Sequence, residues 1–132
     1  MKSKIFLLAG IIVLITSCEK SDNGIVSQKL VQWNVLKVEG PITGLVNQVL
    51  TFDVYCPTSS GCDYVSKFVT DVSNGKTILI KAYGGTNKNT ICLESATPID
   101  IKYDFTPLEK GNYVLIFINK DASEIKYNFI VD

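Results

Sequence analysis

Histidine and arginine are both missing from this sequence of 132 residues, so every basic side chain is a lysine. Without histidine there is no imidazole to act as a general base, complete a catalytic triad or bind a metal. Without arginine the usual bidentate clamp for phosphate is also missing. The formal net charge is zero, so no basic field attracts nucleic acid. These absences exclude a nucleic-acid-binding protein and any enzyme that depends on histidine.

A long apolar run is missing as well. The uncharged apolar stretch Ile5–Ile15 is well short of the roughly 20 residues that a membrane-spanning helix needs. Lys2 and Lys4 precede it, and the small residues Thr16 and Ser17 follow it. A charged start, a short apolar run and small residues before a cut are the parts of a secretory signal peptide. We therefore expect export across a membrane and no permanent transmembrane helix.

The end of this signal resembles a bacterial lipobox, in the residues Ile15-Thr16-Ser17-Cys18. The resemblance implies cleavage before Cys18, a diacylglycerol thioether on its sulfur and an acylated N-terminus that carries palmitate-type chains. Two or more chains hold a protein stably on a bilayer. Glu19 follows the cysteine, which resembles the sorting pattern for the outer membrane in some Gram-negative bacteria. The alternative is an ordinary cleaved signal that leaves a soluble periplasmic domain without lipid.

The chain from Cys18 to Asp132, which remains after cleavage of the signal peptide, is long enough for one domain with a modest core. We expect a signal helix over residues 1–17, the lipidated N-terminus and a flexible tether over 18–32, and a β-domain over 33–132. Apolar and polar residues alternate with the strand period of two in several segments, and Asn74-Gly75 predicts a type I′ turn between two of them. The expected strands are Val31–Val38, Gln48–Tyr55, Tyr64–Val72, Thr77–Tyr83, Ile99–Phe105, Tyr113–Ile118 and Ile125–Val131.

Seven short strands separated by turn signals predict an all-β, antiparallel, seven-stranded sandwich. Glu109, Gly111 and Tyr113 resemble the tyrosine corner of immunoglobulin-like domains, in which the tyrosine hydroxyl bonds back across a connection. The antibody pattern is not followed, since Leu115 stands where the second intersheet cysteine would be. The chain also resembles small immunoglobulin-like lipoproteins of Gram-negative bacteria, through Gly40-Pro41 and through Phe105-Thr106-Pro107 ahead of Tyr113.

Cysteine is scarce, with four residues in all, of which Cys18 is assigned to the lipid. In an oxidising compartment the remaining three allow one internal disulfide and leave one thiol over. Strands that run alternately up and down bring the loop with Cys56 and Cys62 to the same end as the loop with Cys92. We predict the disulfide Cys62–Cys92, with Cys56–Cys92 as the second choice and Cys56–Cys62 as the third.

Few residues form a pattern that indicates catalysis or metal binding. Asp100 and Asp104 share one face of a strand, and a solvated outer face explains them. Asp53 and Asp63 flank a loop, where they could meet a calcium ion together with loop carbonyls. We expect no metal and no cofactor. An enzyme or thiol-redox protein would need Cys56 or Cys62 exposed beside a lysine such as Lys88.

The function predicted from these observations is that of a non-enzymatic binding or structural lipoprotein of the cell envelope. Its partners would be the membrane, through the lipid anchor, and an unknown protein or glycan. Loops gathered at one end of the sandwich would contact that ligand, because loops on a rigid scaffold carry function. The thiol-redox enzyme and the soluble periplasmic domain remain as alternatives.

Overall fold

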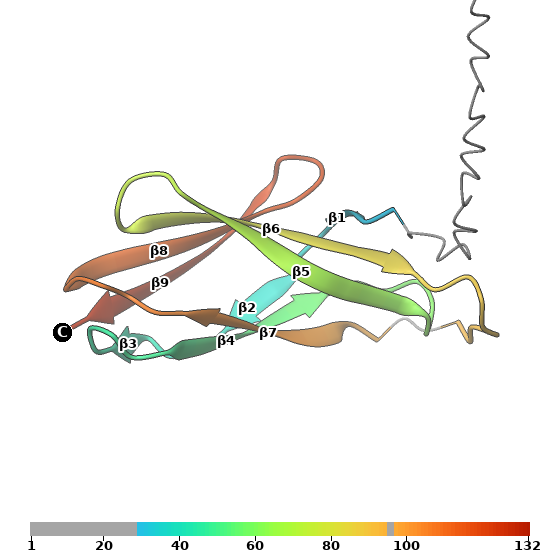
Figure 1. Cartoon of the computed structure of the whole chain (residues 1–132), viewed down its shortest axis with the longest axis horizontal. Coiled ribbons are helices and arrows are strands. Elements are labelled where there is room, and N and C mark those ends of the chain that lie inside the picture. The colour runs from blue at the N-terminus through green and yellow to red at the C-terminus, as the bar shows by residue number, and fades with distance from the viewer. Residues whose placement is uncertain (1–28, 95–96) are drawn as a thin grey trace, which may run out of the picture.

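The computed structural model describes residues 29–94 and 97–132, and every regular element in these ranges is a β-strand. Nine strands form two sheets that pack face to face as a sandwich (Figure 1). The predicted signal peptide, Cys18 and most of the predicted tether lie outside the described residues. Within the two described ranges, no helix has the length and apolarity that crossing a bilayer requires.

The larger sheet has six strands. Its members are β1 (Val31–Trp33), β3 (Thr43–Gly44), β5 (Asp63–Val72), β6 (Thr77–Thr86), β8 (Gly111–Ile118) and β9 (Glu124–Val131). β5 and β6 form one antiparallel hairpin, and β8 and β9 form another. β6 runs parallel to β8, and β1 pairs antiparallel with the C-terminal part of β6. β8 is therefore central, as its nearly continuous apolar sequence predicts.

The smaller sheet contains β2 (Lys37–Glu39), β4 (Leu50–Cys56) and β7 (Ile99–Phe105), all antiparallel. Along β7 the side chains alternate as the sequence predicts. Asp100, Lys102 and Asp104 are exposed, whereas Tyr103 is buried against the opposite sheet. The Lys102 ammonium group contacts the Asp53 carboxylate on β4, so the outer face of this sheet is a solvated layer of paired charges.

The expected strand Val31–Val38 is in fact two strands in different sheets, which corrects the prediction of seven strands. β1 belongs to the larger sheet and β2 to the smaller one, and the chain crosses between them at Asn34–Leu36. Val35 is buried at this crossing. β1 begins at Val31, so it takes in the last residues of the predicted tether. The alternation of apolar and polar residues changes phase within the crossing, because Val35 and Leu36 are consecutive apolar residues. The prediction of one continuous strand overlooked this break, since a strand keeps its period of two throughout.

The second correction is that the larger sheet is mixed. β7 lies in the other sheet, so the chain leaves the larger sheet after β6 and returns as β8 in the same direction. The two-residue strand β3 follows Gly40-Pro41 and runs parallel to the end of β9. Alternating side chains define the faces of a strand but not its neighbours or their direction, which is why the sequence did not predict these pairings.

The β5–β6 hairpin is present, but its turn is not the predicted type I′. The Ser73 N–H donates to the Thr77 carbonyl at 3.0 Å, which closes a longer turn around Asn74, Gly75 and Lys76. Gly75 has a φ of 57°, whereas Asn74 is not among the residues with positive φ. A type I′ turn requires positive φ at both central positions. The prediction from Asn74-Gly75 was therefore right about the position of the turn and wrong about its type.

The core lies between the sheets and is built from alternate residues of β4, β6, β8 and β9. Phe52 and Val54 of β4 face Leu115 and Phe117 of β8, and all four side chains are fully buried. Burial of each such side chain contributes about 1.5–3 kcal/mol to stability. Aromatic rings extend this core toward the β5–β7 side, where Phe68 lies edge-on to Tyr103 with 5.3 Å between ring centroids.

Candidate functional site at the disulfide end

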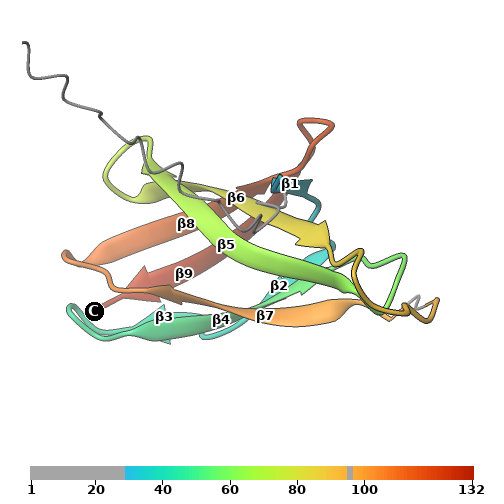
Figure 2. The same ribbon diagram turned by 45° about the vertical axis from the view of Figure 1, so that its right-hand side comes forward.

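Two connections lie together at one end of the sandwich. They are residues 57–62, between β4 and β5, and residues 87–94 with 97–98, between β6 and β7 (Figures 1 and 2). The β8–β9 loop, residues 119–123, projects separately from them in both views. The expectation that loops gather at one end is thus met for the first two connections. We call the end formed by residues 57–62 and 87–94 the disulfide end.

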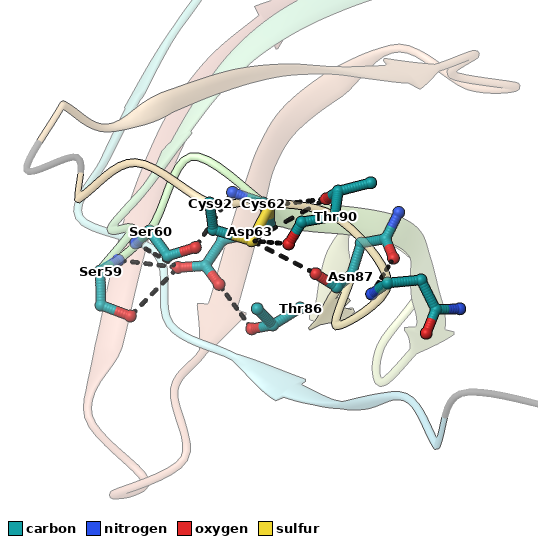
Figure 3. The surroundings of a disulfide bond; sticks show 9 residues. Ser59, Ser60, Cys62, Asp63, Thr86, Asn87, Thr90 and Cys92 are labelled. Carbon is teal, nitrogen blue, oxygen red and sulfur yellow. Dashed lines mark hydrogen bonds between the residues drawn. A yellow bond between two sulfur atoms is a disulfide. The ribbon is translucent and has the colours of Figure 1, made fainter.

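The disulfide Cys62–Cys92 joins these two loops, which confirms the predicted pairing (Figure 3). The Cα atoms of the two residues are 5.4 Å apart, and 30 positions separate them in the sequence. Further hydrogen bonds reinforce the link. The Gly61 N–H donates to the Leu93 carbonyl at 2.7 Å, and the Asn87 N–H donates to the Cys62 carbonyl at 2.9 Å. The two loops therefore form one braced unit.

Cys56 does not lie in the loop, contrary to the sequence prediction. It is the last residue of β4, and its side chain is fully buried in the core. Its thiol is free, and burial raises its pKa to about 11. A thiol this deeply buried is almost entirely protonated at neutral pH and has no route to a substrate. The position follows from the strand itself, because Leu50, Phe52, Val54 and Cys56 all fall on the inward face.

Asp63 organises the turn at the start of β5. One of its carboxylate oxygens accepts hydrogen bonds from the Ser59 N–H at 2.7 Å and the Ser60 N–H at 3.0 Å, and the other accepts from the Thr86 hydroxyl at 2.5 Å (Figure 3). The bonds from Thr86 and from the two serine N–H groups lower the pKa of Asp63. Asp63 is only 9 % exposed and both of its carboxylate oxygens accept hydrogen bonds, so it holds the loop in place.

The most exposed apolar side chains of the disulfide end are Ile91 and Leu93. They are 98 % and 78 % exposed, although the backbone that carries them is fixed by the disulfide at Cys92 and by the hydrogen bond from Gly61. Single exposed aliphatic residues are common on protein surfaces. Here two of them flank a disulfide-bonded cysteine, so they form an apolar projection on a braced backbone.

A shallow hollow adjoins the first residues of the β4–β5 loop. Its volume is about 290 Å³, and its walls are Trp33, Asn34, Pro57, Thr58, Ser59 and Lys120. The Trp33 indole N–H donates to the Pro57 carbonyl at 2.8 Å, and the Lys120 ammonium lies 5.6 Å from the centre of the indole ring. The hollow thus joins β1, the β4–β5 loop and the β8–β9 loop around one aromatic side chain.

Tyr113 lies far from these loops, at the start of β8. Its hydroxyl donates to the Glu109 carbonyl at 2.9 Å, across the connection that leads into the strand. Its ring is stacked on Phe129 of β9, with 5.3 Å between ring centroids. This geometry closes the β7–β8 connection onto the sheet, so Tyr113 has a structural role.

The carboxylates considered for calcium do not form a binding site. Asp104 accepts a hydrogen bond from Thr51, and Asp100 is paired with Lys102. The Asp53 carboxylate contacts Lys102, whereas the Asp63 carboxylate accepts hydrogen bonds from the turn that precedes it. The two carboxylates therefore have different partners and do not face a common ion. Among the described residues, no three His, Cys, Asp or Glu side chains are grouped to hold a metal ion.

Three residues of this region were not identified from the sequence. Asp63 was considered only as a cation ligand, although aspartate side chains also bond to backbone groups three or four positions earlier in the chain. Trp33 and Lys120 come from opposite ends of the sequence, and no local pattern indicates that they meet. Their proximity depends on the pairing of β1 with β6, which places β1 beside the end of β8. There the Gln32 side-chain amide donates to the Ile118 carbonyl at 2.8 Å.

The architecture defines an all-β sandwich protein, and comparison with known families gives its membership. Residues 52–129 match the family model of the ORF11 beta-sandwich domain, which is more than half of the chain. The chain belongs to this family. The match runs from β4 to β9 and includes Cys56, the disulfide and Tyr113. Searches of curated proteins and of solved structures found no significant match.

Proposed function

We propose that this protein is a lipid-anchored, non-enzymatic binding module of a bacterial cell envelope, which contacts a partner protein through its disulfide end. The observation that carries the proposal is the pair Ile91 and Leu93, almost fully exposed on a loop that a disulfide and backbone hydrogen bonds hold in place. Aliphatic anchors on a rigid loop bind at low entropic cost. The Tyr113 hydroxyl bond supports an immunoglobulin-like relationship for the scaffold.

The anchor is inferred from residues 1–18 alone, where a short signal ends in a lipobox-like cysteine. The test is growth of a Gram-negative host that expresses the full chain in the presence of radioactive palmitate. The label should follow the wild-type protein into the outer-membrane fraction and be lost in Cys18→Ser. Unlabelled wild-type protein in the periplasmic fraction would leave the soluble alternative.

The binding role is tested by cross-linking in intact cells of the native host. Ile91→Ser combined with Leu93→Ser should abolish the cross-linked adduct that wild-type protein forms. Leu108→Ser is the matched control, because Leu108 is also an exposed leucine, at 74 %, but lies in the β7–β8 connection at the other end of the sandwich. Equal adduct yield from the double variant and from wild type would refute a role for this end.

A glycan ligand is the second candidate, and the hollow at Trp33 favours it. Trp33 lines this hollow together with Asn34, Thr58 and Ser59, whose amide and hydroxyl groups are of the kind that bind sugar hydroxyls. Isothermal titration with envelope oligosaccharides distinguishes the candidates. Loss of heat in Lys120→Ala, with no effect of Ile91→Ser, would support the glycan over the protein partner.

A thiol-redox function receives no support from the cysteine geometry. Cys62 and Cys92 are joined to each other, and Cys56 is buried with a raised pKa. Reaction of the folded domain with a thiol reagent at neutral pH tests this point directly. Fast reaction that is lost in Cys56→Ala would favour the redox alternative.

A further inference from the structure

β5 is an edge strand of the larger sheet. It has ten residues and pairs only with β6 among the described strands, so its other edge carries backbone groups without a ladder partner. Exposed edges of this length are templates for pairing with another chain. The register of β5 against β6 shifts between Val65 and Lys67, and beyond this bulge the strand is regular as far as Val72. The usable edge is therefore the segment 67–72.

The backbone directions in this segment follow from one hydrogen bond. The Ser73 N–H donates to the Thr77 carbonyl on the β6 side. Because these directions alternate along an antiparallel strand, Lys67, Val69 and Asp71 also bond toward β6. The N–H and C=O groups of Phe68, Thr70 and Val72 then point to the open edge. A second β5 running antiparallel must place these even-numbered residues opposite one another.

The side chains select one register. Lys67, Val69 and Asp71 share the outer face of the sheet, where Val69 is 46 % exposed and Lys67 and Asp71 are exposed. If the twofold axis passes between the two Val69 residues, Lys67 of each copy lies opposite Asp71 of the other. In the described structure neither charge makes an ion pair of its own. The segment is thus self-complementary in charge as well as in backbone geometry.

We propose that this chain forms a homodimer by antiparallel pairing of β5 with β5 of a second copy, centred on Val69. About four backbone hydrogen bonds join the strands, through Phe68 and Thr70 of each copy. The two larger sheets become one continuous sheet. A hollow on its outer face is repeated on each side of the seam, with walls formed by Val69, Asp71, Leu79, Lys81, Tyr83 and Ile118. The small interface places the dimer in the weak, transient class. The proposal is independent of the role assigned to the disulfide end.

The test is oxidative cross-linking of full-length protein in detergent, with a cysteine placed at the axis. Two residues at a non-hydrogen-bonded position face each other with Cα atoms about 4.5 Å apart, within the range that a disulfide spans. Val69→Cys should therefore yield a covalent dimer under mild oxidation. Lys81→Cys is the matched control, because Lys81 pairs with Val69 on the same face but would lie roughly 14 Å from its copy, three strand spacings away.

Charge swapping tests the register. In the Val69→Cys background, Lys67→Asp places carboxylates opposite each other at both ends of the seam, and the cross-linking rate should fall on the order of tenfold. Adding Asp71→Lys should restore the rate. Cross-linking of Val69→Cys that is no faster than that of Lys81→Cys, or a rate that the double swap does not restore, would overturn the proposal.

Discussion

Asn119 and Val35 are 84 positions apart in the sequence, yet two hydrogen bonds join them directly in the buried interior. The Asn119 side-chain oxygen accepts from the Val35 N–H at 2.7 Å, and its amide nitrogen lies 3.3 Å from the Val35 carbonyl oxygen, to which it donates. Val35 is the point at which the chain crosses from one sheet to the other, so it has no ladder partner. One asparagine thus supplies both bonds that the crossing needs.

Replacing Asn119 with alanine should therefore destabilise the fold. The buried N–H and C=O of Val35 would lose their partners, at a cost of about 1–3 kcal/mol in the free energy of unfolding. Urea denaturation followed by Trp33 fluorescence measures it. Asn128→Ala is the control, since Asn128 is exposed on β9 and its loss should change stability by less than about 0.5 kcal/mol. Equal effects of the two variants would contradict the assigned role.

Asp63 should make stability depend on pH in the acid range. Its pKa is lowered in the folded state, so its contribution is fully present above the unfolded pKa of about 3.9 and is lost as pH falls through the folded value. Asp63→Asn should be less stable than wild type at pH 7, by about 1–3 kcal/mol. The difference should shrink below about pH 4, as chemical denaturation at pH 7, 4 and 2.5 would show. A difference that does not vary with pH would rule this out.

The disulfide should contribute strongly to stability while leaving the sheets intact. A closed loop of this length is worth about 3–4 kcal/mol in the chain-entropy account. The double variant Cys62→Ser with Cys92→Ser should lose that amount in guanidinium denaturation and keep its β-type circular dichroism. Reduction of wild type should give the same loss, and reduction should have no further effect on the double variant.

Cys56 should be unreactive until the protein unfolds. Its burial and raised pKa predict that Ellman's reagent reaches this thiol only in denaturant, with Cys56→Ala as the variant that assigns the signal. Cys56→Ser should cost about 1–3 kcal/mol, because it places a hydroxyl among apolar side chains. A Cys56 thiol that reacts within seconds under native conditions would contradict the buried position.

Local patterns predicted much of this fold, because they depend on adjacent residues. The alternation of Ile99–Phe105 predicted both the strand and its exposed face. The up-and-down order of the strands predicted Cys62–Cys92 as the first of three possible disulfides, and this pairing is confirmed. The same alternation, continued from Phe52 and Val54, would have placed Cys56 in the core. The contact of Trp33 with Lys120, and the bonds of Asn119 to Val35, depend on which strands are neighbours. A period of two carries no such information, so neither the mixed sheet nor the hollow was predicted.

The position of β1 limits how far the disulfide end can lie from a lipid attached to Cys18. Val31 pairs with Gly84, so the chain enters the sandwich close to the disulfide end and not at the far end. Eleven peptide steps separate Cys18 from Lys29, and a fully extended chain of that length spans at most about 40 Å. A lipid on Cys18 would therefore restrict Ile91 and Leu93 to a thin layer of periplasm or surface next to the bilayer. Their binding partner would have to be found within that layer.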